Sequence, residues 1–199
     1  MADFTKLTGD AELWTYFRQG DENAYTELAR RYYRTLLHYG LRFTPNLQLV
    51  EDILQDLLVH LWLHRDSISD TPYVKFYLVK AFRHRMIKTI RPLSGEVELT
   101  DHFDSVNPEF SSEDMLIGDE TEIALTRQVR NAIDKLPARQ QEVIYLRFFQ
   151  NLRPDEIAGL LSINPQSVSN IIQRALSNLR DLWHTAYPIL FYSFYQILY

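Results

Sequence analysis

Apolar residues recur at three- and four-residue spacing through most of the chain, which is the period of a helix with one buried face. In the first half, such runs extend from Leu28 to Tyr39, from Val50 to Trp62 and from Val74 to Ile90. The alternation of a strand is absent over any useful length, and Gly and Pro are sparse within the runs. The pattern predicts a bundle of helices in this half of the chain.

The second half predicts shorter helices with clear start signals. Pro137 precedes ARQQEVIYLRFF, and Pro154 opens PDEIAGLL with two acidic residues in its first turn; both arrangements favour a helix start. Asn164 and Pro165 form another signal, as cap and first helical residue. A short helix, a tight turn and a longer helix together predict a helix-turn-helix, although helical hairpins without a DNA role have a similar pattern.

The net charge of −5 is unevenly distributed along the chain. Residues 1–91 carry 13 basic and 11 acidic side chains, residues 92–122 carry ten acidic and no basic ones, and residues 123–199 carry eight basic and five acidic ones. The middle segment also has the Pro, Gly and Ser content of a linker. We therefore predict an all-α protein with two small helical domains, residues 1–91 and 123–183, an acidic linker at 92–122 and an aromatic tail at 184–199.

The amino-acid composition excludes some classes of protein. The absence of cysteine excludes disulfides and thiolate chemistry, and 46% hydrophobic with 24% charged residues is typical of a folded domain. Because there is no secretory signal and no apolar run of ~20 residues, we expect a cytoplasmic protein that does not insert into a membrane. The apolar tail from Tyr187 to Tyr199 is too short to span a bilayer, and we expect it to pack on the second domain rather than to bind a partner.

Two surfaces have the chemistry of nucleic-acid binding. The outward face of the last predicted helix carries short hydrogen-bonding side chains and one guanidinium, which suit base edges and phosphates in a major groove, although an ordinary solvated face would look the same. Between Thr71 and Gly95 there are six basic residues and no acidic one, with aromatic residues interleaved. Basic groups can follow a phosphate backbone while exposed aromatic rings stack on unpaired bases; core packing of the aromatic rings is the alternative.

Enzymatic features are weak. His60 and His64 are four residues apart, with Asp56 one turn earlier, but the glutamate of an HExxH metal site is missing. No glycine-rich phosphate loop or Ser/His/Asp arrangement is present. We therefore predict no catalytic residue, no metal site and no cofactor.

Several segments resemble a known family. The segments GDENAYTELARRYYRTL, VEDILQDLLVHLW and YLVKAFRHRMIKTIR are similar to the second region of bacterial sigma factors. The segment from Leu136 to Arg180 is similar to their fourth region. With no third region between them, the order resembles the extracytoplasmic-function (ECF) subfamily of the sigma-70 family over about residues 10 to 182.

The resemblance implies a dissociable subunit that directs promoter recognition, DNA melting and transcription initiation. Its implied partners are core RNA polymerase, promoter DNA as duplex and as melted non-template strand, and an anti-sigma factor. The EDxxQD motif would bind polymerase, the basic-aromatic helix would bind the minus-ten element, the loop Ser67–Tyr73 would receive a flipped base, and the helix-turn-helix would bind the minus-thirty-five element. The implied polymerase-binding residues are Glu51, Asp52, Gln55 and Asp56; the minus-ten residues are Tyr73, Tyr77, Lys80, Arg83, His84, Arg85 and Lys88; the minus-thirty-five residues are Arg147, Gln166, Ser167, Ser169, Asn170, Gln173 and Arg174.

The sequence departs from the family pattern at a few positions. His84 stands where the family usually has Asn, and Ser162 replaces the usual turn glycine. Ser169 and Ile171 replace residues that are often basic, which predicts a smaller phosphate contribution and a shallower salt dependence for this helix.

Two other classes of protein remain as alternatives. A free-standing helix-turn-helix regulator would bind a palindromic operator without polymerase, but it leaves the EDILQD motif and the basic-aromatic helix without a role. An adaptor of polymerase or of an anti-sigma factor, without DNA binding, is favoured only by the low charge of the last helix.

Overall fold

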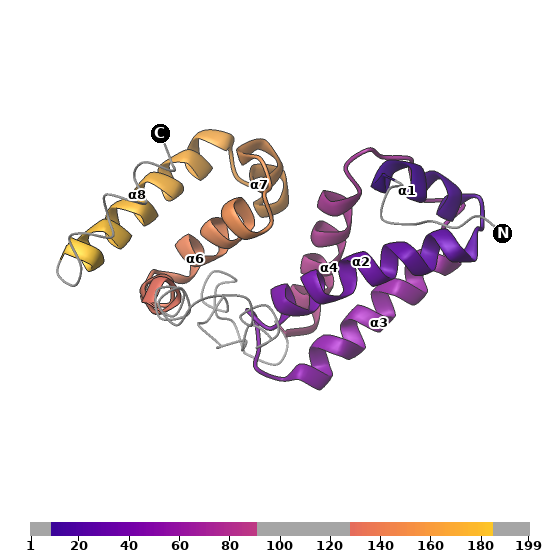
Figure 1. The fold of residues 1–199 in the computed structure, drawn as a ribbon, viewed down its shortest axis with the longest axis horizontal. Helices are drawn as coiled ribbons and strands as arrows, with labels where there is room; N and C mark the ends of the chain where they lie inside the picture. The colour runs from indigo at the N-terminus through magenta and orange to yellow at the C-terminus, as the bar shows by residue number, and fades with distance from the viewer. Residues whose placement is uncertain (1–8, 91–127, 185–199) are drawn as a thin grey trace, which may run out of the picture. The chain divides into compact units, whose positions relative to one another are not determined.

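A computed structural model describes residues 9–90 and 128–184 of the 199-residue chain. Every regular element in these two ranges is a helix, which confirms the predicted fold class. The helices form two compact units, one with α1 to α4 and one with α6 to α8 (Figure 1). The predicted linker at 92–122 and the tail beyond His184 lie outside the described residues.

The first unit is a four-helix arrangement in which the three predicted helices are present and one further helix precedes them. Capping residues set two of the starts: the Asp21 carboxylate accepts hydrogen bonds from the first turn of α2, and the Asn46 side chain does the same for α3. The additional helix is α1, a nine-residue element in which only three side chains are buried. The bounds are α1 Asp10–Arg18, α2 Glu22–Gly40, α3 Leu47–Leu63 and α4 Val74–Ile90.

The core of this unit is formed where all four helices meet. Trp14 of α1, Leu36 of α2 and Leu54 of α3 are at most 1% exposed. Phe82 and Met86 of α4 are fully buried. Burial of large apolar side chains at helical spacing accounts for the predicted pattern and leaves the polar faces of α3 and α4 toward solvent.

Gly40, the last residue of α2, lets that helix approach α3 and α4 closely. A Cβ atom at this position would collide with the Val50 side chain and lie 3.0 Å from the Phe82 ring. Val50 and Phe82 are both fully buried, so neither has free space into which it can move. We predict that Gly40→Ala lowers the free energy of unfolding by about 1–3 kcal/mol through overpacking, measured by urea denaturation. An unchanged transition midpoint would contradict the close approach.

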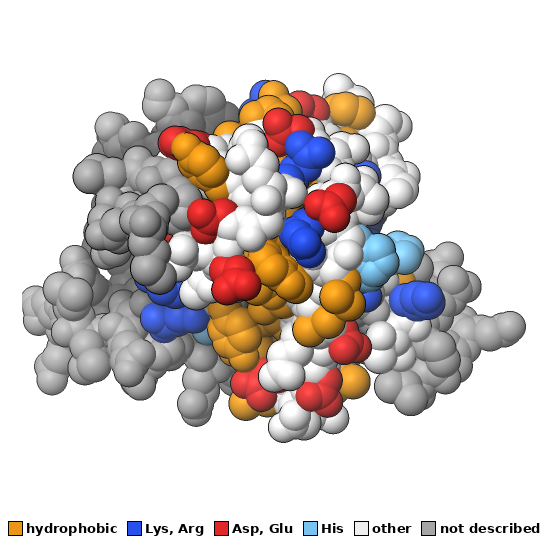
Figure 2. All heavy atoms as spheres, turned by 90° about the vertical axis from the view of Figure 1, so that its right-hand side faces the viewer, with side chains coloured by type: hydrophobic (Ala, Val, Ile, Leu, Met, Phe, Trp, Pro, Cys, Tyr) orange, Lys and Arg blue, Asp and Glu red, His pale blue; other side chains and the backbone are white. Residues whose placement is uncertain are grey.

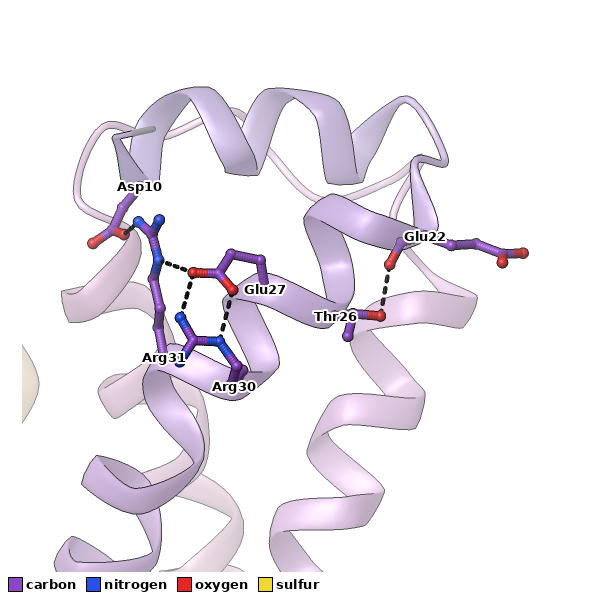
Figure 3. A network of polar contacts seen from close by, with 6 residues as sticks. All are labelled: Asp10, Glu22, Thr26, Glu27, Arg30 and Arg31. Atoms are coloured by element: carbon purple, nitrogen blue, oxygen red, sulfur yellow. Dashed lines mark hydrogen bonds and ion pairs between the residues drawn. The ribbon is translucent and has the colours of Figure 1, made fainter. Parts of the chain in front are cut away.

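Polar contacts attach α1 to α2 (Figure 3). The Glu27 carboxylate accepts hydrogen bonds from the guanidinium groups of Arg30 and Arg31, at 2.8 and 2.7 Å. Arg31 also pairs with Asp10 at the start of α1, over 2.9 Å between Nη1 and Oδ1. The Tyr32 hydroxyl donates to the other oxygen of Asp10. Arg31 thus connects one carboxylate on each helix.

We predict that Glu27→Gln lowers the free energy of unfolding at neutral pH by about 1–2 kcal/mol. The hydrogen bond from Arg30, supported by Arg31, holds the pKa of Glu27 at about 2, below its ordinary value of 4.5. Because the pKa is depressed in the folded protein, this stabilisation is present above about pH 4.5 and is lost as the pH falls toward 2. The difference between wild type and variant in urea unfolding should therefore shrink between pH 5 and pH 2.5; a constant difference would refute the pKa argument.

The second unit contains the predicted helix-turn-helix. Residues 128–133 are helical, and the bounds of the following elements are α6 Ala138–Ile144, η2 Tyr145–Phe149, α7 Pro154–Leu161 and α8 Pro165–His184. The element η2 is a π-helix that continues α6, a change of geometry that the apolar pattern did not predict. Part of the core is a cluster of Ile133, Leu136, Ile144 and Ala175, against which Val129, Leu176 and Leu179 pack.

The turn between α7 and α8 has the predicted cap. The Asn164 side chain accepts a hydrogen bond from the Ser167 backbone N–H at 2.7 Å, and Pro165 is the first residue of α8. Ser162 at the end of α7 has a left-handed backbone, with φ +55°. This conformation explains why glycine suits the position, because a side chain is disfavoured there.

Candidate functional site

The four residues of the EDxxQD motif lie on one face of α3. Asp52, Gln55 and Asp56 are exposed, and Glu51 is half-buried at the edge of the same face. Gln48, one turn earlier, donates a hydrogen bond of 2.9 Å to the Asp52 carboxylate. The structure therefore brings these residues together as an acidic surface that is open to solvent.

Apolar side chains extend this surface beyond the motif. Val59 is 56% exposed and Leu63 is 66% exposed, toward the end of α3, and Leu47 is exposed at its start. Figure 2 shows hydrophobic side chains among acidic and basic ones on one side of the molecule. Val59 and Leu63 were not predicted as part of this surface, although their spacing gave a signal. They fall out of phase with the buried stripe of Leu54, Leu57 and Leu61.

The predicted minus-ten residues fall on α4 and its preceding loop. Five of them share one face by helical spacing. Tyr73, Lys80, His84 and Lys88 are exposed, whereas Tyr77 is half-buried with its ring 5.1 Å from that of Trp14. Burial raises the pKa of the Tyr77 hydroxyl, which keeps it a neutral hydrogen-bonding group.

Arg83 and Arg85 are the two predicted minus-ten residues that lie apart from this face. Helical geometry places them on opposite edges of α4, and both are half-buried. The nearby aromatic residue Phe76 is half-buried, with the Lys80 ammonium 5.6 Å from its ring centroid. The structure thus presents a central strip of lysine, histidine and tyrosine side chains with an arginine on each side.

His60 near the end of α3 lies within reach of the charge of Arg85, and His64 directly follows the helix. The rings of His60 and His64 are stacked, with 4.1 Å between centroids, and Nδ1 of His64 lies 2.9 Å from the His60 carbonyl oxygen. Partial burial, and then the charges of Arg85 and His64, lower the pKa of His60. Within residues 9–90 and 128–184, no three acidic or histidine side chains come together in a metal-binding group.

The predicted minus-thirty-five residues of α8 share its outward face. Gln166, Asn170, Gln173 and Arg174 are exposed, and Ser167 and Ser169 are half-buried at the edges. The Gln166 amide nitrogen lies 3.2 Å from the Asn170 side-chain oxygen, so these two amides are oriented by each other. The opposite side of the helix packs on the core through Val168 and Ala175, both fully buried.

Arg147 is the one predicted minus-thirty-five residue outside α8. It lies in η2, is half-buried, and donates a hydrogen bond of 3.2 Å from Nη1 to the Leu152 carbonyl oxygen. Its neighbours Phe148 and Phe149 are more than 40% exposed. The π-helix therefore presents one arginine and two aromatic rings next to the start of the helix-turn-helix.

Comparison with known proteins identifies the class to which this fold and these faces belong. The family model "Sigma-70 region 2" matches residues 28–94, and "Sigma-70, region 4" matches residues 126–179. Together the two matches cover more than half of the chain. The protein belongs to the sigma-70 family of RNA polymerase sigma factors, and within that family it is an ECF member.

Curated relatives of similar length support the subfamily. The chain is 23% identical to the ECF RNA polymerase sigma factor SigM of Bacillus subtilis, over 79% of this chain and 94% of the relative. It is 24% identical to the ECF RNA polymerase sigma factor SigW of the same organism, over 82% and 90%. RNA polymerase sigma factor YlaC, also of Bacillus subtilis, is 28% identical over 77% and 88%.

Two solved structures share the fold. CnrH, in complex with the cytosolic domain of CnrY, matches with a TM-score of 0.59 and 22% identity over 90% of this chain and 99% of that one. The sigma factor RpoE from Bartonella quintana, in complex with the anti-sigma factor NepR, matches with a TM-score of 0.54 and 15% identity over 81% and 97%. At these identities the likeness extends to the fold alone. None of the helices in the described part of this chain is long and apolar enough to cross a membrane.

Proposed function

We propose that this chain binds core RNA polymerase through the acidic face of α3 and directs it to promoters. The single observation that carries the proposal is that one small unit presents an acidic helix face and a basic, aromatic helix face on adjacent elements. Asp52, Gln55 and Asp56 are exposed, so a basic surface on a partner can reach them. Complementary charge of this kind sets the register and the rate of association.

The face of α4 would bind the minus-ten element. Lys80 and Lys88 are exposed on one side of the helix and can contact successive phosphates, while the exposed Tyr73 ring can stack on a base. The loop Ser67–Tyr73 would receive a base that has left the stack. Unstacking costs a few kcal/mol and is least costly at easily opened steps, so DNA melting by this unit would itself be sequence-selective.

The face of α8 would bind the minus-thirty-five element in the major groove. The amides of Gln166 and Asn170 suit adenine, and the Arg174 guanidinium suits guanine or a phosphate. Two weak DNA contacts become a strong one when a single polymerase holds both units, because the second contact is then intramolecular. The acidic segment 92–122 would connect them. The chain itself would carry no catalytic activity.

An anti-sigma factor is the third proposed partner. The RpoE of Bartonella quintana was solved in complex with the anti-sigma factor NepR, and CnrH was solved in complex with the cytosolic domain of CnrY. Occlusion of the α3 or α8 face would be sufficient to prevent initiation, since both contacts are needed in this proposal.

A run-off transcription assay tests the proposal. The purified chain would be added to sigma-free core polymerase and a promoter library, and the start sites would be sequenced. We expect specific starts that share two elements at a fixed spacing. Binding to core without starts would favour the adaptor, and DNA binding without any binding to core would favour a free-standing regulator.

We predict that Arg174→Ala weakens promoter binding by the holoenzyme about fivefold to tenfold, as expected for one lost guanidinium contact. The side chain is exposed on the outward face of α8, so the fold should be unaffected. A filter-binding titration with the mapped promoter measures the effect, and Arg180→Ala, six residues further along α8, is the control for loss of charge. Equal affinities of wild type and Arg174→Ala would contradict the assignment of this face to the groove.

A further inference from the structure

The loop between α3 and α4 is attached to α1 by side chains that reach its backbone. The Arg18 Nε donates a hydrogen bond of 2.6 Å to the Ile68 carbonyl oxygen. The Trp14 Nε1 donates a hydrogen bond of 3.2 Å to the next carbonyl, that of Ser69. Two consecutive carbonyl groups in the middle of the loop are therefore fixed from outside the loop.

The helix that makes these contacts is itself held firmly. Trp14 and Phe17 are each 1% exposed in the core of the unit. Asp10 at the other end of α1 is paired with Arg31 of α2, whose guanidinium also binds Glu27 (Figure 3). The apolar face of α1 is buried in the core, and its first turn is ion-paired to α2. The helix is therefore a rigid support for the loop residues that its side chains contact.

Most side chains of the loop whose backbone α1 holds are exposed to solvent. Ile68 is buried, whereas Ser69, Asp70, Pro72 and Tyr73 are exposed. Trp14 contacts the start of α4 as well, through the Tyr77 ring. One residue of α1 therefore touches both the loop and the helix to which we assign the minus-ten contacts.

We propose that Trp14 and Arg18 are positioning residues that hold the 67–73 loop in the conformation that receives an unpaired base. The proposal rests on the function proposed above and extends it to α1, which lies outside the matched region 28–94. Ordering a loop residue costs backbone conformational entropy. Loop residues that are already ordered do not pay this cost when the base binds, and the base then binds more tightly and with better discrimination.

The test compares the contribution of each base of the melted strand. A single-stranded non-template oligonucleotide would be taken from a promoter mapped by run-off sequencing, and each base in turn would be replaced by an abasic site. Holoenzyme affinity for each oligonucleotide would be measured by fluorescence anisotropy. For wild type we expect one position at which the abasic site lowers affinity about tenfold, in the range of one stacked base.

The decisive variant is Arg18→Ala, which we expect to reduce that penalty to about twofold and to leave the other positions and core binding unchanged. Arg34→Ala, at an exposed position of α2, is the matched control for the loss of one positive charge. It leaves the bond from Arg18 to the Ile68 carbonyl in place and should keep the full penalty. Arg18→Met, which keeps a side chain of similar reach but has no N–H donor, should behave like Arg18→Ala and serves as the decisive variant if the alanine protein does not fold.

The possible outcomes separate this inference from the proposed function. A penalty that survives in both Arg18 variants, or an equal loss of affinity at every position, would overturn the positioning role, since general destabilisation affects all positions alike. If no abasic site lowers the affinity of wild-type holoenzyme, the loop does not bind an unpaired base. This inference then fails together with that part of the proposed function. Run-off starts and core binding are measured independently of the abasic series.

Discussion

Binding to core RNA polymerase should fall at least about 100-fold when Asp52 and Asp56 are both replaced by lysine. The two carboxylates lie one turn apart on the exposed face of α3, and each replacement converts an attraction into a repulsion. Close charge pairs across an interface contribute about 1.5 kcal/mol or more each, so two reversals are sufficient for a loss of this size. The affinity of labelled protein for core polymerase, measured by fluorescence anisotropy, gives the result directly.

A matched pair of substitutions controls for the change in net charge. Glu12→Lys with Glu22→Lys alters the charge equally at exposed positions of α1 and α2. This control should bind core within about twofold of wild type, apart from a small long-range effect that salt screens. An equal loss in both proteins would mean that net charge, and not the face of α3, determines the affinity. Because all four side chains are exposed, the circular dichroism and thermal transition should stay close to those of wild type.

The triple variant Tyr73→Ala, Lys80→Ala, Lys88→Ala is expected to lower the affinity of holoenzyme for a promoter with an unpaired non-template strand about 100-fold. Loss of one stacked base contributes about 1–3 kcal/mol, and the remainder comes from the two lysines. All three side chains are exposed, Lys80 and Lys88 on α4 and Tyr73 directly before it, so their removal does not disturb the core.

The salt dependence of the affinity shows how much of this loss comes from contacts with phosphates. Removal of two phosphate contacts to a single strand should reduce the slope of log affinity against log salt by about 1.4. Arg34→Ala with Lys135→Ala removes the same charge from α2 and from the second unit and should leave both affinity and slope nearly unchanged. A triple variant with the wild-type slope would show that Lys80 and Lys88 do not contact phosphates.

The sequence predicted the helices that bury a long apolar stripe and missed features that depend on local detail. Leu54, Leu57 and Leu61 repeat over several turns, and α3 followed from them. Only three of the nine residues of α1 are buried, which is too short a pattern to separate from chance. The π-helix at Tyr145–Phe149 differs from an α-helix by a single residue per turn, and side-chain spacing does not reveal such a change.

The candidate faces were predictable to the extent that they depend on one helix. Gln166 and Asn170 are four residues apart and therefore adjacent on any α-helix, as the structure shows. Other features depend on how separate helices pack. These are the position of Arg85 near His60 and the contacts of α1 with the loop carbonyls. Residue spacing along one helix carries no information about such contacts.

The π-helix also determines how this domain could change over evolutionary time. Its wide turn is closed by the Gln150 backbone N–H, which donates to the Tyr145 carbonyl oxygen over 3.0 Å, and by the Gln150 side chain, which donates to the Tyr145 hydroxyl. A π-turn accommodates one residue more than an α-turn, and each residue of a helix corresponds to a rotation of about 100°. Loss of one codon in this segment would restore an α-turn and rotate everything after it relative to α6. The segment is thus a point at which a deletion can change the direction of α8 without any substitution on the surface of that helix.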